Sequence, residues 1–197
     1  MSQLTHEVAR QTEGVVQPPA GVYDLDLTHT SVEFVARHML AKVRGRFTEF
    51  SGTVTVGSTP EESSVEVEIK ADSIQTNTEQ RDQHLKSGDF LTVEEFPTLT
   101  FRSSAVRPLE GTRFELDGDL TIKGITQPVT LRGQYLGLSK NPYGMTVLAA
   151  TARTSIERED WDMTWNVAIE TGGWLVSKKI DLEVEVEAIL RETEQEA

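Results

Sequence analysis

Residues 180–188 read I-D-L-E-V-E-V-E-A, so that apolar and acidic side chains alternate without a break. A strand with one dry face and one wet face requires this period of two. We therefore predict a strand in which Leu182, Val184 and Val186 point inward. The acidic residues between them are predicted to face water.

The same alternation recurs in several other segments of the chain. Their apolar positions are Val32, Phe34 and Ala36; Val65, Val67 and Ile69; Leu99 and Phe101; Phe114 and Leu116; and Val129, Leu131 and Tyr135. So many half-buried strands with hardly any helix between them predict an all-β protein whose sheet closes into an antiparallel barrel with room for a ligand. Short turns separate the strands of 98–155, which favours sequential antiparallel pairing in a meander.

One segment breaks the alternation. Thr76 and Glu79 stand at the spacing of a capping box, and Gly88 provides a stop signal. These signals predict one short helix near residues 78–87. Because the segment is the only long non-strand connection inside the barrel sequence, we expect the helix to cover one end of the pore and to gate or orient a ligand.

The composition favours a single acidic domain. The chain has 197 residues, and 32 acidic against 19 basic side chains give a formal net charge of -13. This charge repels phosphate backbones and anionic bilayer surfaces, so nucleic acid is not expected as a partner. The absence of cysteine excludes disulfide bonds and thiol catalysis.

The two ends of the chain differ from the middle. Residues 1–20 and 191–197 lack the periodicity of packed strands, which predicts a flexible N-terminal tail and an acidic C-terminal tail around a barrel domain at 21–190. The start of the chain lacks the basic and apolar regions of a signal peptide, which predicts a cytoplasmic location. No apolar window is long enough to span a bilayer, so stable membrane insertion is not expected.

The sequence shows no familiar catalytic or cofactor motif. It contains no G-x-S-x-G elbow, no phosphate loop and no G-x-G-x-x-G, and its histidines lack the spacing of a metal site. We therefore predict no catalytic residue, no metal and no cofactor. His38 continues the inward parity of its strand and is expected to meet either a buried carbonyl or a ligand. Asp160 and Asp162 are interpreted as turn caps rather than as catalytic carboxylates.

Two kinds of large side chain could act at an end of the pore. Trp161 and Trp165 lie close together in sequence and are expected either to plug an end of the barrel or to form a ligand wall. An acidic ligand would need a positive group, because the net charge of the protein otherwise repels it. Arg81 on the predicted helix and Arg158 at a predicted strand end are the first arginines to test.

Many short motifs, in order over about residues 21–190, resemble those of the YceI-like family of polyisoprenoid-binding, lipocalin-like proteins. They are L-D-x-x-H-T-S-V-E-F at 25–34, histidine at 38, V-R-G-R-F at 43–47, S-I-x-T at 73–76, R-D-x-H-L at 81–85, D-F-L at 89–91, F-P-T-L-T-F at 96–101, G-D-L-T-I-K-G at 118–124 and R-E-D-W at 158–161. The resemblance implies an eight-stranded antiparallel up-and-down barrel, lipocalin-like, with a long hydrophobic pore. Such a pore holds an amphiphile such as an isoprenoid lipid, a quinone or a fatty amide.

The chain departs from the family pattern in two places. Many relatives carry a secretory signal, which this sequence lacks. The usual D-F-G after the arginine is D-W-D at residues 160–162, so an aspartate replaces the family glycine at a pore end.

We predict that the protein binds, stores or transports such an isoprenoid-like or acyl lipid without changing it chemically. The predicted wall or end-group residues are Phe34, His38, Phe47, Val67, Ile69, Arg81, His84, Leu85, Phe101, Leu120, Leu131, Val147, Trp165 and Val184. Two other hypotheses stay open. One is an enzyme that acts on the lipid through His38 or His84 with a nearby carboxylate, and the other is a filled barrel that serves as a scaffold for another protein. The long edge of the terminal strand, together with the resemblance, also predicts a homodimer.

Overall fold

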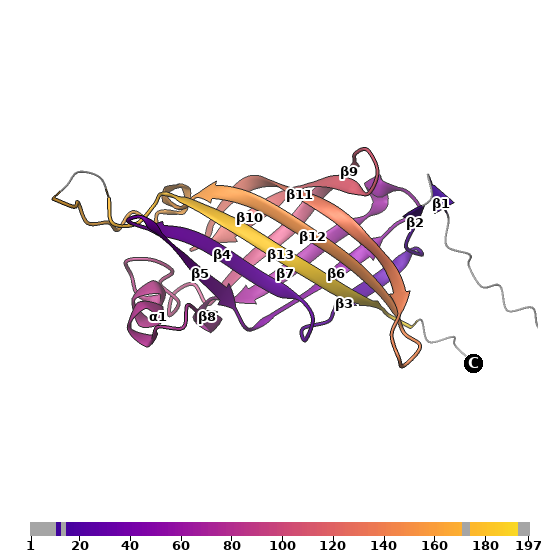
Figure 1. Ribbon diagram of the computed structural model, residues 1–197, viewed down its shortest axis with the longest axis horizontal. Helices are drawn as coiled ribbons and strands as arrows, with labels where there is room; N and C mark the ends of the chain where they lie inside the picture. Colours follow the sequence, from indigo (N-terminus) through magenta and orange to yellow (C-terminus); the bar gives the residue numbers. More distant parts are fainter. Residues whose placement is uncertain (1–10, 13–14, 171–173, 193–197) are drawn as a thin grey trace, which may run out of the picture.

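The computed structural model describes residues 11–12, 15–170 and 174–192 (Figure 1). The remainder of the two predicted tails lies outside the described residues. An 11-stranded sheet closes on itself through an additional pairing of its β12 with β13. A separate two-stranded ribbon, β1 (Gln11–Thr12) and β2 (Val15–Val16), lies at one end of the barrel, and the helix lies at the opposite end.

Three strands of the barrel are interrupted, and each is divided into two shorter strands. They are β3 (Gly21–Leu25) with β4 (Ser31–His38), β5 (Ala41–Phe47) with β6 (Phe50–Val56), and β7 (Ser64–Lys70) with β8 (Ile74–Gln75). Five strands are continuous, namely β9 (Thr98–Pro108), β10 (Arg113–Ile122), β11 (Ile125–Lys140), β12 (Thr146–Glu157) and β13 (Lys179–Leu190). All neighbouring strands pair antiparallel, so the predicted eight-stranded barrel is confirmed.

Strand β13 closes the barrel because both of its edges are paired. One edge pairs with β12 along the whole strand. The other edge pairs with β4 through residues 181–185 and with β3 through residues 188–190. The homodimer prediction rested in part on a free edge at this strand, and that part of the argument is wrong.

The alternation in β13 has the predicted orientation. Leu182, Val184 and Val186 line the interior of the barrel, whereas Glu183 and Glu185 are exposed. The apolar side chains are therefore shielded from the water outside the barrel, whereas the acidic side chains stay hydrated.

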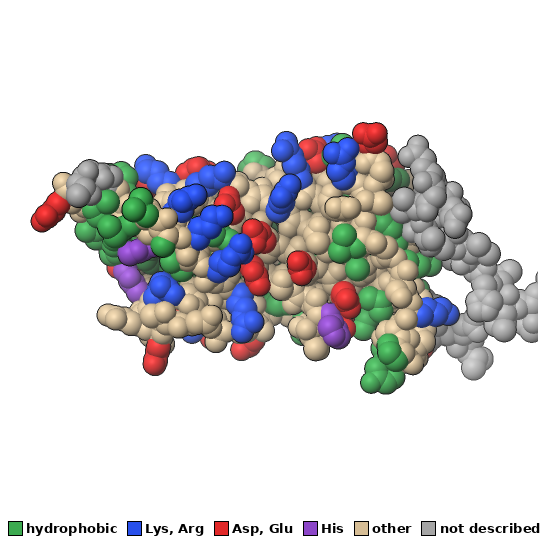
Figure 2. Space-filling model, in the orientation of Figure 1, with side chains coloured by type: hydrophobic (Ala, Val, Ile, Leu, Met, Phe, Trp, Pro, Cys, Tyr) green, Lys and Arg blue, Asp and Glu red, His purple; other side chains and the backbone are tan. Residues whose placement is uncertain are grey.

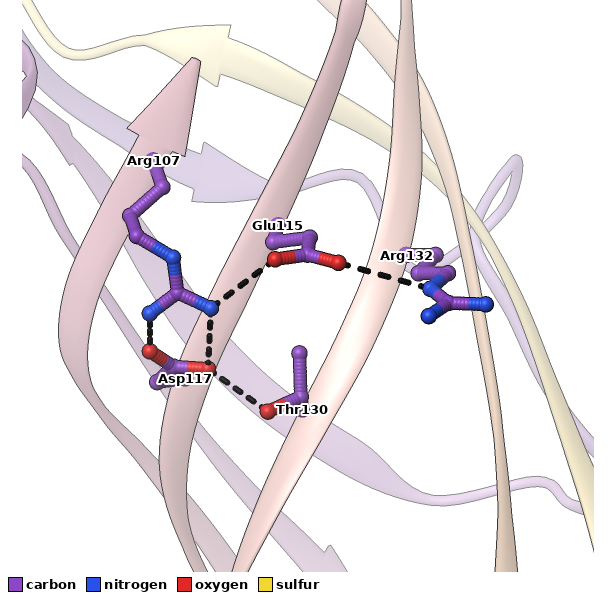
Figure 3. Close-up of polar contacts among 5 residues, drawn as sticks. All are labelled: Arg107, Glu115, Asp117, Thr130 and Arg132. Atoms are coloured by element: carbon purple, nitrogen blue, oxygen red, sulfur yellow. Dashed lines mark hydrogen bonds and ion pairs between the residues drawn. The ribbon is translucent and has the colours of Figure 1, made fainter. Parts of the chain in front are cut away.

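The outer face of the barrel carries paired charges. Arg107 on β9 donates to Glu115 at 2.9 Å and also contacts Asp117, while Arg132 on β11 donates to Glu115 at 3.4 Å (Figure 3). Thr130 donates to Asp117 at 2.6 Å. The hydrogen bond from Arg107 lowers the pKa of Glu115. Acidic and basic side chains are interspersed over the face shown in Figure 2, so opposite charges lie near one another. Because these ion pairs are exposed to solvent, each contributes little to stability.

The helix α1 (Glu79–Lys86) forms inside the predicted range, but its start is built differently. The predicted capping box is wrong, because no side chain caps the helix at Thr78. Instead, the carboxylate of Asp82 accepts from the backbone N–H of Thr76 at 2.8 Å, and Arg81 Nε donates to Thr76 Oγ1 at 2.7 Å. Side chains of the helix thereby fasten its first turn to the end of β8.

Three short 3-10 helices complete the secondary structure. They are η1 (Pro60–Glu62), η2 (Ala71–Ser73) and η3 (Arg158–Trp161). Among the described residues, no helix has the length and apolar character needed to cross a bilayer.

A charge placed on the inner face of β13 tests this register. Val184→Asp is expected to lower the free energy of unfolding by about 3 kcal/mol, or roughly 10 °C in Tm, because it buries an unpaired carboxylate. Glu185→Asp, on the outer face of the same strand, is the control and should melt like the parent. Thermal melting followed by circular dichroism measures both variants, and equal melting of Val184→Asp and the parent would overturn the register.

Candidate functional site

A cavity of about 880 Å³ occupies the interior of the barrel. Its wall consists of the inward side chains of the barrel strands, and most of them are apolar. Of the predicted ligand-binding residues, those that line it are Phe34, Phe47, Val67, Ile69, Leu85, Phe101, Leu120, Leu131 and Val184. The barrel is therefore not filled, and the filled-barrel hypothesis is wrong on this point.

Val147 is an exception among the predicted wall residues, because it does not line the cavity. It lies opposite Ile189 in β13, whereas its neighbour Leu148 lies opposite Ala188, which has the parity of Val184. Leu148 accordingly lines the cavity in its place. The sequence around Val147 lacks alternation, so it does not indicate which of its side chains face inward.

Glycines on neighbouring strands lie beneath the phenylalanine rings of the wall. Phe34 lies directly opposite Gly45, and Phe114 lies directly opposite Gly133. A Cβ atom at either glycine would overlap the ring of its partner. Each ring therefore occupies the space over a glycine, which leaves the centre of the barrel open.

The helical end of the cavity is closed by buried side chains. Phe90, Leu91 and Met163 are each less than a tenth exposed, and all three line the cavity. Trp161 is also buried and donates its indole N–H to the carbonyl oxygen of Leu120 at 3.2 Å, but it lies outside the lining. Trp161 therefore does not form the ligand wall, and its role as a plug stays a prediction.

The predicted polar end groups do not line the cavity. Arg81 is turned toward Thr76, and His38 is exposed, so the prediction that His38 ends the inward face of its strand is wrong. His84 and Trp165 pack against Phe90, edge-on and tilted respectively, with ring centroids 5.1 Å and 5.5 Å from that of Phe90. Phe90, a lining residue that sequence reasoning did not single out, thus connects them to the site.

The same placement bears on the enzyme hypothesis. His84 Nε2 lies 2.8 Å from Asp89 Oδ2, so a histidine–carboxylate pair exists. Catalysis within the cavity would require this pair or His38 to face it. Neither histidine lines the cavity.

Arg158 is a buried charged residue at the helical end of the cavity, which it lines. It is 2% exposed and begins η3. Its Nε donates to the carbonyl oxygen of Ser177 at 3.0 Å, its Nη1 donates to that of Met163, and its Cζ lies 5.9 Å from the ring centroid of Phe90. Burial lowers the pKa of the Arg158 guanidinium.

The opposite end of the cavity is more polar and more exposed. Residues 17–20, 57–60 and 111–113 line it there, and Gln17 and Arg113 are exposed. Tyr23 holds the first of these segments by donating its hydroxyl to the carbonyl oxygen of Pro19 at 2.8 Å. Because buried residues close the helical end, we infer that a ligand enters at this exposed end.

Asp162 stands at the position where the resemblance to the YceI-like family implies glycine. Its backbone is left-handed, with φ of 55°, a conformation that favours glycine and that aspartate adopts more readily than most residues. Asp162 does not line the cavity, and Lys123 Nζ donates to its carbonyl oxygen at 2.9 Å. Asp162 is therefore not part of the pore wall.

One cluster of potential metal ligands lies outside the cavity, in the described part of the chain. Asp26, His29 and Glu187 bring their ligand atoms within 4.8 Å of one another. His29 Nδ1 lies 2.9 Å from Asp26 Oδ2, and this hydrogen bond raises the pKa of His29. The cluster lies at the break between β3 and β4. This position brings Asp26 and His29 next to Glu187 of β13.

Comparisons with known proteins agree with this architecture. The sequence model of the YceI-like domain matches residues 23–188. UPF0312 protein SA2479 of Staphylococcus aureus (strain N315) is 37% identical over 176 residues, which cover 86% of this chain and 98% of that protein.

Solved structures share the fold. The Campylobacter jejuni YCEI protein aligns with a TM-score of 0.69 at 26% identity, covering 79% of this chain and 90% of the other. A polyisoprenoid binding domain from Saccharophagus degradans aligns with a TM-score of 0.66 at 12% identity, covering 88% of this chain and 100% of the other. At the lower identity, the likeness concerns the fold alone.

The glycine beneath Phe114 provides a test of how the cavity is kept open. Gly133→Ala is expected to displace the Phe114 ring and to lower Tm by roughly 5 °C, because overpacking costs about 1–3 kcal/mol. Gly88→Ala is the control, since a Cβ there meets nothing within 4 Å. Thermal melting compares the variants, and an unchanged Tm for Gly133→Ala would show that the ring does not depend on this glycine.

Proposed function

Because this chain belongs to the YceI-like family, we propose that its barrel binds a long-chain amphiphile and stores or transports it without chemical change. The observation that supports the proposal is the apolar cavity of about 880 Å³. This volume lies within the range of about 300–1,000 Å³ that is typical of sites for small molecules. The wall offers many apolar contacts along its length and a polar rim at its exposed end.

The energetics of binding need no catalytic group. Transfer of each methylene from water to an apolar wall contributes about 0.8 kcal/mol, so a chain of about ten carbons contributes roughly 8 kcal/mol. That gain is comparable with the cost of association, which is about 4–15 kcal/mol. A longer chain gains more transfer free energy and therefore offsets a larger cost. A barrel of this kind therefore selects for chain length before it selects for the polar group.

The relatives indicate the class of ligand. The solved domain from Saccharophagus degradans is described as polyisoprenoid binding. An isoprenoid-like or acyl chain fits the same kind of apolar interior in this protein. The enzyme hypothesis is less favoured, because it required His38 or His84 to face the cavity and neither does. A cytoplasmic location and a homodimer stay predictions.

Mass spectrometry of the native protein after organic extraction tests the proposal directly. We expect a long-chain lipid to co-purify with the protein, and the emptied protein to bind such a lipid saturably. The proposal is contradicted if lipid titration shows no saturable binding, or if the protein converts the lipid in a reaction that depends on His38 or His84.

A bulky residue in the wall tests where the chain lies. Val67 lines the cavity between Gly52 and Phe101 on the neighbouring strands, so Val67→Trp is expected to shorten the longest lipid that the protein accepts. Glu66→Trp places the same ring on the exposed face of β7 and is the control. Binding of a series of fatty acids of increasing length measures the cut-off, and the same cut-off in both variants would exclude Val67 from the path of the chain.

A further inference from the structure

The guanidinium of Arg158 has hydrogen-bonding capacity that the described residues do not use. A guanidinium carries N–H donors on three nitrogens. In Arg158, Nε and Nη1 donate to backbone carbonyl oxygens, whereas Nη2 is buried without a partner among the described residues. Buried polar groups almost always have partners, so an unpaired donor in a native fold requires an explanation.

Arg158 also lacks a direct ion-pair partner among the described residues. In the described part of the chain, three charged residues line the cavity, namely Glu33, Arg113 and Arg158. Glu33 lies 3.9 Å from Arg44, and Arg113 lies 3.3 Å from Glu110. Arg158 forms no ion pair within the described residues, although the carboxylate of Glu159 interacts with it electrostatically. A buried charge without a direct ion-pair partner is costly, and a ligand oxygen at this position would offset part of that cost.

We propose that Arg158 binds a carboxylate or carbonyl oxygen at the polar end of the bound amphiphile. The inference rests on the proposed function and adds an orientation to it. The polar end of the ligand lies at the helical end of the cavity, and its chain extends toward residues 17–20. A charge-assisted hydrogen bond to an oxygen is stronger than a neutral one, so this contact distinguishes an acyl lipid from a plain hydrocarbon.

Phe90 controls access to this donor. Its ring lies over the guanidinium and also lines the cavity. Because Nη2 is buried, a ligand oxygen reaches it only when a neighbouring side chain shifts, and Phe90 is the ring that lies over the guanidinium. His84 and Trp165 pack against Phe90 and therefore act on the contact through that ring.

A purely structural role accounts for only part of the geometry. The backbone N–H of Arg158 donates to the carbonyl oxygen of Lys178 at 2.9 Å, and the side chain bonds to Ser177 and Met163. These contacts fasten η3 to the segment before β13. They leave Nη2 unexplained, and a fastening role predicts no difference between ligands with and without an oxygen.

The test compares probes of equal chain length on the lipid-free full-length protein. Hexadecanoic acid, hexadecanamide and hexadecane each displace the apolar dye diphenylhexatriene. We expect the parent to bind the acid and the amide more tightly than the alkane. Arg158→Met should weaken the two oxygen-bearing probes roughly 10- to 100-fold and leave hexadecane unchanged, because only those probes lose a hydrogen bond to a charged donor. Arg132→Met, on the exposed outer face of β11 and outside the cavity lining, is the matched control and should leave all three affinities unchanged.

The outcomes separate this inference from the proposed function. If the parent binds all three probes equally, or if Arg158→Met retains the affinity of the parent for both oxygen-bearing probes, the inference is overturned while the cavity still binds chains. If the parent binds neither the dye nor any probe, the proposed function itself fails. Should Arg158→Met not fold, Arg158→Gln, which keeps polar donors for the backbone carbonyls but loses the charge, takes its place, and the same weakening for the two oxygen-bearing probes is expected.

Discussion

The closure of the sheet along β13 is the constraint on which the rest of the structure depends. This strand pairs with β12 on one edge and with β3 and β4 on the other, so its register determines which residues of three neighbouring strands face inward. Pairing of both edges also leaves no long free edge on β13 to join another chain. The acidic residues of the outer face then follow from the same alternation that places Leu182, Val184 and Val186 inside.

A closed barrel of this size could be filled by its own side chains, and its phenylalanines indicate why it is not. Phe34 and Phe114 each have a glycine directly opposite on the next strand. The rings occupy the space over these glycines, so large side chains form the wall without meeting across the centre. The cavity is therefore a consequence of paired large and small residues, and the binding proposal depends on it.

Much of the fold and of the wall could be predicted from the sequence, because alternation reports directly which side chains are buried. Val67, Ile69 and Phe101 follow from that rule. Val147 lies where alternation is absent, so its orientation is set by pairing with β13 rather than by local pattern. His84 and Arg158 were also singled out from the sequence, but their contacts with Trp165 and Ser177 join segments distant in sequence, and such contacts leave no local signal. Sequence reasoning therefore identified the pore and candidate end groups, but not Phe90 and Met163, which help to close its inner end.

Because of the break between β3 and β4, the barrel wall is less stiff along one edge of β13 than along the other. Between the two strands, Thr30 Oγ1 and the backbone N–H of Asp26 donate to the carbonyl oxygen of Glu187, at 2.9 Å and 2.8 Å, in place of a regular ladder. On the other edge, β12 and β13 are paired without interruption. Local opening of the wall is therefore expected at the interrupted seam, where fewer ladder hydrogen bonds would have to break than between β12 and β13.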